Sequence, residues 1–155
     1  ICLSTDGGAT FVPRVLDVDD RAADFVPSGV MFPSPQVGLT WFAEPSAGAY
    51  LQRSTDGGAT WHAVALPADL AGAALQLPVG FFAPDGQHGW LAGYDTSGPG
   101  HAVLIATGDA GATWATVDGV AEAVQAFHGG KLYAGFALDA SHVWLGGEQG
   151  LVMHN

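Results

Sequence analysis

Basic residues are scarce in this chain, and their scarcity excludes one class of partner. Of the 155 residues, four are Lys or Arg and fifteen are Asp or Glu, which gives a formal net charge of −11 at pH 7. A charge of this sign repels phosphate backbones and anionic membrane surfaces unless a cation intervenes. We therefore expect no nucleic-acid partner.

Cysteine and long apolar runs are also scarce. Cys2 is the only cysteine, which excludes an intramolecular disulfide and any metal site built from several cysteines. The sequence has no run of about 18 apolar residues that would predict a membrane-spanning helix, and no basic start with an apolar core that would mark a signal peptide. It starts at Ile1, in a strand-like run and not with Met, so we expect a processed or truncated product. Its compartment is left open by these features.

Glycine and proline, in contrast, are plentiful. The 23 glycines and 9 prolines are scattered between apolar runs, and 48% of the residues are hydrophobic. This distribution predicts many short elements joined by turns around a packed core, without long helices.

One short motif occurs three times. It reads STDGGATF at Ser4–Phe11, STDGGATW at Ser54–Trp61 and TGDAGATW at Thr107–Trp114. Its aspartates lie 50 and 53 positions apart. This period suits one four-stranded blade per repeat.

A tryptophan repeats with a similar period. Trp41, Trp90 and Trp144 follow one another at intervals of 49 and 54 positions. The apolar stretches before them contain Phe32, Phe82 and Phe136. We expect the three tryptophans to occupy one register of the repeat and to pack between blades.

Apolar runs separated by turn-forming residues predict four strands in each complete unit. The strands of the middle unit are predicted at 77–83, 89–93, 102–107 and 113–117, and those of the preceding unit at 29–32, 39–43, 49–53 and 60–66. Residues 1–16 supply the last two strands of a partial unit, and residues 131–155 supply the first three strands of another. Consecutive strands are expected to pair antiparallel, as a meander.

The repeated motif is interpreted as a structural hairpin. Its second glycine is present in every copy, which indicates a position that needs positive φ. Its aspartate is expected to accept hydrogen bonds from backbone N–H groups of the turn, and its closing aromatic ring to bury itself between adjacent sheets. The predicted structural residues are Asp6, Gly8, Thr10, Phe11, Asp56, Gly58, Thr60, Trp61, Asp109, Gly111, Thr113 and Trp114.

This motif resembles the Asp-box, or bacterial neuraminidase repeat, of β-propellers. The stretch Gly89–Gly93, which reads GWLAG, is similar to the inner-strand signature of propellers like the photosystem II stability and assembly factors. The resemblance implies that the aspartates are structural and that the protein is a scaffold that binds protein partners. It also implies an extracytoplasmic location, secreted or periplasmic.

The fold class expected is therefore all-β, with propeller blades that are four-stranded antiparallel meanders. About three blades are predicted, as an incomplete ring or as part of a larger or oligomeric propeller. The predicted divisions are a partial blade at 1–28, blades at 29–74 and 75–123, and a partial blade at 124–155. Since propellers typically have four to eight blades, we expect a longer ring, or copies of the chain that complete one another.

Two kinds of enzyme share this resemblance and provide the alternative function, a glycan-binding or glycan-cleaving propeller. Sialidases hold their substrate with three arginines on the central face, whereas the arginines here are Arg14, Arg21 and Arg53, and none lies in the tetrapeptide that marks the first blade of that family. Xyloglucanase-like glycosidases need two carboxylates that flank a glycosidic bond. We favour the non-catalytic scaffold, with no catalytic residue assigned.

Binding residues are expected where the repeat is broken. The acidic segment LDVDDRAADF supplies Asp17, Asp19, Asp20 and Asp24, which are interpreted as a solvated loop, with a glycosidase pair or a calcium site as the alternative. The loop from Tyr94 to His101 and the segment around Lys131, the only lysine, are the other candidate surfaces.

Histidine is not expected to bind metal here. His88 and His142 each stand two residues before a tryptophan, and such repeated placement indicates hydrogen bonding in a turn or between blades. No metal site or cofactor is assigned. The expected partners are a protein or further copies of this chain.

Overall fold

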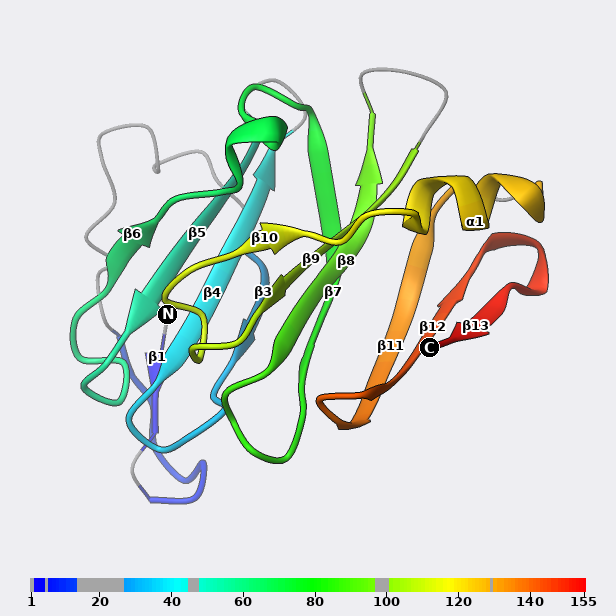
Figure 1. Cartoon of the computed structure of the whole chain (residues 1–155). Helices are drawn as coiled ribbons and strands as arrows, with labels where there is room; N and C mark the ends of the chain where they lie inside the picture. Colours follow the sequence, from blue (N-terminus) through cyan, green and yellow to red (C-terminus); the bar gives the residue numbers. More distant parts are fainter. Residues whose placement is uncertain (1, 5, 14–26, 45–47, 97–100, 129) are drawn as a thin grey trace.

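The computed structural model describes residues 2–4, 6–13, 27–44, 48–96, 101–128 and 130–155 (Figure 1). Nearly all regular structure in these residues is β-strand, and the exceptions are one short helix, α1 (Val120–Ala126), and 3-10 turns at Ala68–Leu70 and Glu148–Gly150. The predicted acidic loop, with Asp17, Asp19, Asp20 and Asp24, lies outside the described residues.

The strands form four antiparallel sheets. The N-terminal hairpin consists of β1 (Cys2–Leu3) and β2 (Val12–Pro13). The first sheet contains β3 (Pro27–Met31), β4 (Gly38–Glu44), β5 (Gly48–Ser54) and β6 (His62–Val64). The second sheet contains β7 (Leu75–Phe82), β8 (Gly89–Asp95), β9 (His101–Thr107) and β10 (Ala115–Thr116). The third sheet contains β11 (Leu132–Asp139), β12 (His142–Gly147) and β13 (Val152–His154).

Within each sheet, neighbours in space are neighbours in the chain, so the predicted meander is confirmed. The three larger sheets stand side by side in chain order (Figure 1). Each predicted strand coincides with an observed one within a few residues, although the outermost strands β6 and β10 are shorter than expected. The hydrophobic pattern and the turn residues therefore located the strands well.

The second sheet is covered on both faces, which explains its composition. All of Gly89–Gly93 in β8 and Ala102–Ile105 in β9 are buried, and a strand packed on both sides needs a nearly continuous apolar run. The core lies in two layers on either side of this sheet, one cluster against the first sheet and one against the third.

Close contacts fix the spacing between the sheets. Trp41 donates a hydrogen bond from Nε1 to the carbonyl of Leu77 at 2.6 Å, from β4 of the first sheet to β7 of the second. On the other side of the second sheet, Phe81 stacks on Trp90 with ring centroids 5.5 Å apart. A side chain at Gly135 of β11 would overlap the Phe81 ring. Glycine at this position therefore lets the third sheet approach the second.

The expectation that the three tryptophans share one register is wrong for Trp41. The ladders place Trp90 opposite Phe81 and Trp144 opposite Phe136. In the first sheet the corresponding residue is Leu39, because Gly38 pairs with Ser54 just as Gly89 pairs with Thr107 at the start of the motif.

Trp41 instead corresponds to Ala92, two positions further along the strand. Both positions project to the same face, because side chains alternate along a strand. A large side chain at either position can fill the space against the next sheet. The first sheet has its tryptophan at one position and the second sheet at the other, and both positions are apolar in both sheets. The spacing of tryptophans alone does not reveal this shift.

The closing aromatic residues of the motif also divide into two groups. Trp61 and Trp114 are buried, as expected, but Phe11 is 62% exposed. In the first sheet the ring of Phe32 contacts Trp61 edge-on at 6.0 Å, whereas the N-terminal hairpin pairs with no further strand among the described residues. Burial of Phe11 is therefore a wrong prediction, since the ring needs a neighbouring sheet to cover it.

The helix α1 was not predicted. It follows Gly119, whose φ of 79° turns the chain, and it buries Val120 and Val124 against the second-to-third sheet cluster. The helix has only seven residues, or about two turns. So short a stretch of helical periodicity is hard to recognise in a sequence made mostly of strands. The helix spans the boundary predicted between residues 123 and 124.

No helix among the described residues is long and apolar enough to cross a membrane.

Candidate functional site

The three copies of the aspartate motif have the same hydrogen bonds. In each copy one carboxylate oxygen accepts the backbone N–H of the threonine four residues later at 2.9 Å, and the other accepts its hydroxyl at 2.6 Å. The preceding Ser or Thr hydroxyl donates to the aspartate and accepts from the N–H of the second glycine. Both carboxylate oxygens of each aspartate therefore accept hydrogen bonds from residues of the same turn.

These bonds favour the charged form of the aspartates. The hydroxyl of Thr10 is the largest influence that lowers the pKa of Asp6, to about 2, and the hydroxyl of Thr113 lowers the pKa of Asp109 to about 2. The pKa of Asp56 is lowered for the same reason, through Thr60. A carboxylate that these bonds hold in its ionised form is unsuited to act as a general acid.

The second glycine of the motif has the backbone geometry expected of it. Its φ is 91° at Gly8, 89° at Gly58 and 81° at Gly111. The residue before it also has positive φ, but at a lower value that Ala110 adopts, with φ of 55°. This difference explains why alanine replaces the first glycine in one copy and not the second.

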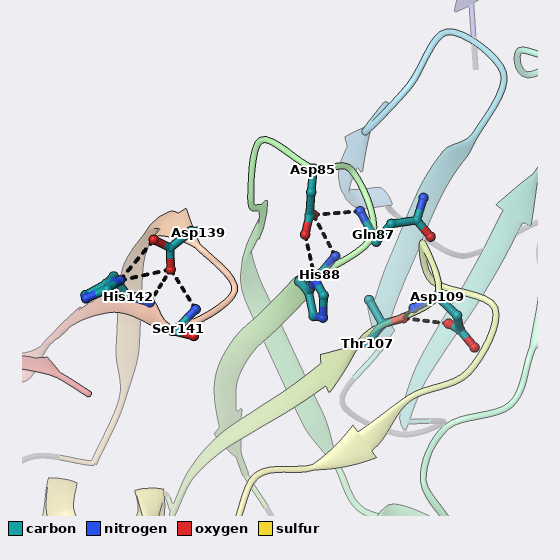
Figure 2. A network of polar contacts seen from close by, with 8 residues as sticks. All are labelled: Asp85, Gln87, His88, Thr107, Asp109, Asp139, Ser141 and His142. Atoms are coloured by element: carbon teal, nitrogen blue, oxygen red, sulfur yellow. Dashed lines mark hydrogen bonds and ion pairs between the residues drawn. The ribbon is translucent and has the colours of Figure 1, made fainter.

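The motif turn docks on the turn between the first two strands of its own sheet. Gly57 donates its N–H to the carbonyl of Gln36 at 2.8 Å, and Ala110 donates to Gln87 at 2.9 Å. Figure 2 shows the Thr107–Asp109 turn beside the loop that carries Asp85 and Gln87. The motif thus connects the ends of all four strands of a sheet.

Histidine takes part in these strand turns, as expected. Asp85 and His88 form a side-chain contact of 2.6 Å, and Asp139 and His142 form the equivalent contact at 2.9 Å (Figure 2). The hydrogen bond from His88 is the main reason that the pKa of Asp85 is lowered to about 2. The backbone N–H of Ser141 is the largest influence that lowers the pKa of Asp139.

A different cluster joins two of the candidate binding residues. Lys131 lies just before β11, and its Nζ is 4.9 Å from the centre of the Tyr94 ring at the end of β8. The same Nζ lies 3.7 Å from Oε1 of Glu148. Tyr133 completes the group, since its ring meets Tyr94 edge-on at 6.3 Å and its hydroxyl donates to Glu148 at 3.4 Å. We call Tyr94, Lys131, Tyr133 and Glu148 the tyrosine–lysine cluster.

The backbone holds Glu148 in this cluster. Its N–H donates to the carbonyl of Lys131 at 3.0 Å, and its carboxylate accepts the N–H of Gly130 at 3.2 Å. The cluster therefore bridges the second and third sheets through one residue of each charge and two aromatic rings. Such an arrangement presents flat apolar area and hydrogen-bonding groups together.

The rings of this cluster are accessible. Tyr133 is 50% exposed. Partial desolvation is the largest influence that raises the pKa of Tyr133, opposed by Lys131 and reinforced by Glu148. The phenol is therefore neutral at physiological pH and keeps the proton that it donates to Glu148.

His101 is the third described candidate residue, and it has a different neighbour. Its Nδ1 lies 3.4 Å from Nε2 of Gln125 on α1. Because His101 pairs with Asp95 at the start of β9, it lies at the same end of the second sheet as Tyr94. The structure gives no contact between it and the tyrosine–lysine cluster.

Sequence reasoning missed Tyr133 and Glu148. Tyr133 lies in the segment around Lys131 that was already considered a break in the repeat. Glu148 follows Trp144 by four residues, just as Tyr94 follows Trp90, and these tryptophans share a register. Comparison of these two units position by position would have placed Glu148 beside the candidate residues.

The features expected of glycan-active propellers are not assembled in the described part of the chain. Arg53 donates from Nε to the carbonyl of Ala110 at 2.9 Å, in the layer between the sheets. Arg14 and Arg21 lie outside the described residues, as does the whole acidic loop. Among the residues that are described, no group of three or more His, Cys, Asp or Glu side chains is placed to hold a metal ion.

No family model and no curated protein matches this chain in sequence. Among solved structures, YCF48 bound to a D1 peptide is similar to it with a TM-score of 0.56 and 19% identity, over 81% of this chain and 35% of that one. YCF48 from Cyanidioschyzon merolae gives a TM-score of 0.42 and 11% identity, over 97% of this chain and 61% of that one.

The chain thus spans about a third of the length of the first of these structures. The first likeness concerns the fold, and it agrees with the antiparallel meanders described above. The naming of the repeated turn as an Asp-box stays a prediction. The expected fold is confirmed: the chain consists of β-propeller blades, arranged as in a propeller like YCF48.

Proposed function

We propose that the chain is a non-catalytic propeller scaffold that binds a segment of a partner protein at the tyrosine–lysine cluster. The observation that carries the proposal is the convergence of Tyr94, Lys131, Tyr133 and Glu148 from neighbouring sheets. Tyrosine rings contribute strongly to protein interfaces because they bury a large area at small entropic cost. The YCF48 structure bound to a D1 peptide gives an example of a propeller that holds a peptide.

The charge of the chain indicates what kind of segment would bind. With a net charge of −11, the surface attracts cationic partners over a distance of about a Debye length, ~8 Å at physiological ionic strength. The only lysine is already paired with Glu148 and lies over the Tyr94 ring, so a guest cation would meet the exposed Tyr133 ring and no uncompensated positive charge. We infer that the partner segment is basic.

The experiment is a binding measurement with synthetic peptides of equal length whose net charge ranges from negative to positive. Fluorescence anisotropy of labelled peptides should show saturable binding of the basic members, weakened at high salt. Tyr133→Ala should weaken it at least several-fold, because an aromatic contact of this kind contributes about 1–2 kcal/mol. The matched control is Phe136→Ala, which removes a ring that is 60% exposed on the same strand.

The alternative function, a glycan-binding or glycan-cleaving propeller, is tested with the same variants. Tyrosine rings also stack on sugars, so a panel of oligosaccharides is titrated beside the peptides. Binding of a sugar that Tyr133→Ala abolishes, without peptide binding, would replace the scaffold proposal. Hydrolysis of a sugar that is lost when Asp17, Asp19, Asp20 and Asp24 are all changed to Ala would do the same.

A further inference from the structure

Gln76 of β7 has an unused hydrogen-bond donor. Its side-chain nitrogen Nε2 is buried and has no hydrogen-bond partner among the described residues. A buried donor without a partner destabilises the folded state, and folded proteins pair nearly all of their buried polar groups. A glutamine at this position therefore needs an explanation other than stability.

The side chain of Gln76 projects toward the third sheet. Leu75 and Leu77, its neighbours in β7, are buried in the core cluster against the first sheet, and side chains alternate along a strand. Gln76 is paired with Tyr94 in the ladder between β7 and β8, so these two side chains lie on one face. Tyr94 in turn meets the Tyr133 ring of the third sheet. Gln76 thus lies beside the tyrosine–lysine cluster.

Two strand irregularities occur at the same place. The register of β7 against β8 shifts between Gln76 and Val79. The register of β11 against β12 shifts between Leu132 and Ala134, on either side of Tyr133. A bulge changes the direction in which a side chain points, and bulges are frequent beside functional sites. Both irregularities lie next to residues of the one cluster.

The backbone holds Gln76 in place, whereas its amide can turn. An added Cβ at Gly93 of β8 would lie 1.8 Å from the carbonyl oxygen of Gln76, so the two strands approach more closely here than a side chain at position 93 would allow. The terminal torsion of a glutamine, in contrast, has a broad range. Since Gln76 is only partly buried, rotation of its amide can bring the N–H to the surface.

A peptide on the tyrosine rings needs such a donor. Its main-chain carbonyl groups lose water when the segment lies on apolar ring surface, and a carbonyl without a new donor weakens binding. The Tyr133 hydroxyl and the Gly130 N–H both donate to Glu148 already. The N–H of Gln76 is used by no group among the described residues.

We propose that Gln76 is a further binding residue of the tyrosine–lysine cluster and that its side-chain N–H donates to a main-chain carbonyl of the partner segment. This inference rests on the proposed function and adds to it the group that recognises the main chain of the segment. A donor that is unpaired in the free protein and paired in the complex is typical of a functional site. The ligand is accordingly a basic peptide, and positive charge alone does not satisfy Gln76.

The first test compares stability and binding in one variant. Gln76→Met has an unbranched side chain of similar length without a donor. We expect its unfolding temperature to rise by about 2–4 °C, because the unpaired donor is gone. Its affinity for the best-bound basic peptide should fall about three- to ten-fold, because the hydrogen bond to the peptide is gone. A side chain that only packs between the sheets would not change stability and binding in opposite directions.

Two controls accompany this test. Gln87→Met makes the same substitution at an exposed glutamine on the turn between β7 and β8, at the other end of these strands, and should change neither quantity. Spermine is the second control, because it carries positive charge and no carbonyl group. Any affinity for spermine should be the same in the wild type and in Gln76→Met.

The second test observes the donor itself in the wild-type chain. NMR signals of the glutamine side-chain amides are assigned through their connection to the backbone. During titration with the basic peptide, one Nε2 proton signal of Gln76 should shift downfield, as expected for a new hydrogen bond to a carbonyl. The amide signals of Gln87 should not shift.

The other outcomes overturn the inference, and they are distinguishable from failure of the proposed function. Unchanged affinity in Gln76→Met, or unshifted Gln76 signals at saturation, would exclude Gln76 from a site that Tyr133→Ala still abolishes. A lower unfolding temperature in Gln76→Met would mean that the amide is already paired in the free protein. Equal losses of spermine and peptide binding would show that Gln76 contacts the cation. If no basic peptide binds the wild type, the proposed function fails and this inference fails with it.

Discussion

Arg53 of the first sheet donates a hydrogen bond from its Nε to the carbonyl of Ala110, in the motif turn of the second sheet, at 2.9 Å. This bond connects the third strand of one sheet to the turn that organises the next. Because Arg53 is half-buried and its donor geometry is fixed, the bond helps to set how neighbouring sheets are oriented.

Arg53→Met should therefore destabilise the contact between the two sheets. The variant keeps an apolar stem but loses the donor, so we expect a loss of about 1 kcal/mol in the free energy of unfolding. Arg53→Lys serves as a control, because it keeps the charge and has no Nε donor. If Arg53→Lys were as stable as the wild type in urea, the positive charge of Arg53, and not this hydrogen bond, would account for the stability that Arg53→Met loses.

Gly58 and Gly57 provide a matched pair for the backbone of the motif. Gly58 has φ of 89° and Gly57 has φ of 71°, and an added Cβ would meet an atom at 3.2 Å at either position, the Phe32 ring at Gly58 and the carbonyl oxygen of Pro35 at Gly57. Gly58→Ala should lose about 1–2 kcal/mol of stability, on the scale of a left-handed residue with a Cβ.

Gly57→Ala should lose less, because Ala110 already occupies that position in another copy. Thermal unfolding of the two variants beside the wild type measures the difference. Equal losses would contradict the assignment of the second glycine as the demanding position.

The strands and the motif turns could be predicted because their causes are local. Alternating or continuous apolar runs and turn residues determine where a strand ends, and the comparison of copies identified the second glycine and the aspartate. The position of Trp41 was not predictable from spacing, because Leu39 and Trp41 share a face and either side chain can fill the layer. Only the pairing of Gly38 with Ser54 resolves the register.

The candidate site was predictable only in part, because contacts between sheets bring its residues together. Tyr94 and Lys131 were identified as breaks in the repeat, but their proximity is a product of the packing between sheets. Glu148 reaches the cluster because its N–H donates to the carbonyl of Lys131. Lys131 directly precedes β11 and Glu148 directly follows β12, and the antiparallel pairing of these strands brings the two residues together. Phe11 shows the converse, since it has the position of Trp61 and Trp114 in the motif and is nevertheless exposed: burial of this ring depends on a neighbouring sheet and not on the motif alone.

Asp109 should make the fold sensitive to acid. Its pKa in the folded chain is lowered from 3.8 to about 2 by the hydroxyl and N–H of Thr113, so its contribution is complete above about pH 4 and is lost as the pH falls toward 2. Urea midpoints measured between pH 5 and pH 2 should therefore fall less steeply for Asp109→Asn than for the wild type.

The control for this measurement is Glu122→Gln, which changes an exposed carboxyl on α1. It should keep the pH dependence of the wild type. An unchanged slope in Asp109→Asn would contradict the role of the Thr113 bonds in holding the carboxylate ionised.

Gly135→Ala should disturb the contact between the second and third sheets. An added Cβ would lie 1.9 Å from the Phe81 ring, and forcing extra volume into a packed layer costs about 1–3 kcal/mol. Ala134→Val on the same strand, which is exposed, should have little effect.

A double-mutant cycle identifies the clash. In a Phe81→Leu background, Gly135→Ala should be less destabilising than in the wild type. Additive losses would mean that the two side chains do not compete for the same space.

Labelling of the tyrosine rings tests the binding proposal most directly. The chain has three tyrosines: Tyr94 and Tyr133 lie in the tyrosine–lysine cluster, and Tyr50 lies in β5 of the first sheet and serves as an internal control. NMR spectra recorded with increasing amounts of the best-bound basic peptide should show shifts of the Tyr94 and Tyr133 ring signals, with Tyr50 unchanged. Saturable binding with unshifted Tyr94 and Tyr133 signals would contradict the proposal that this cluster holds the partner.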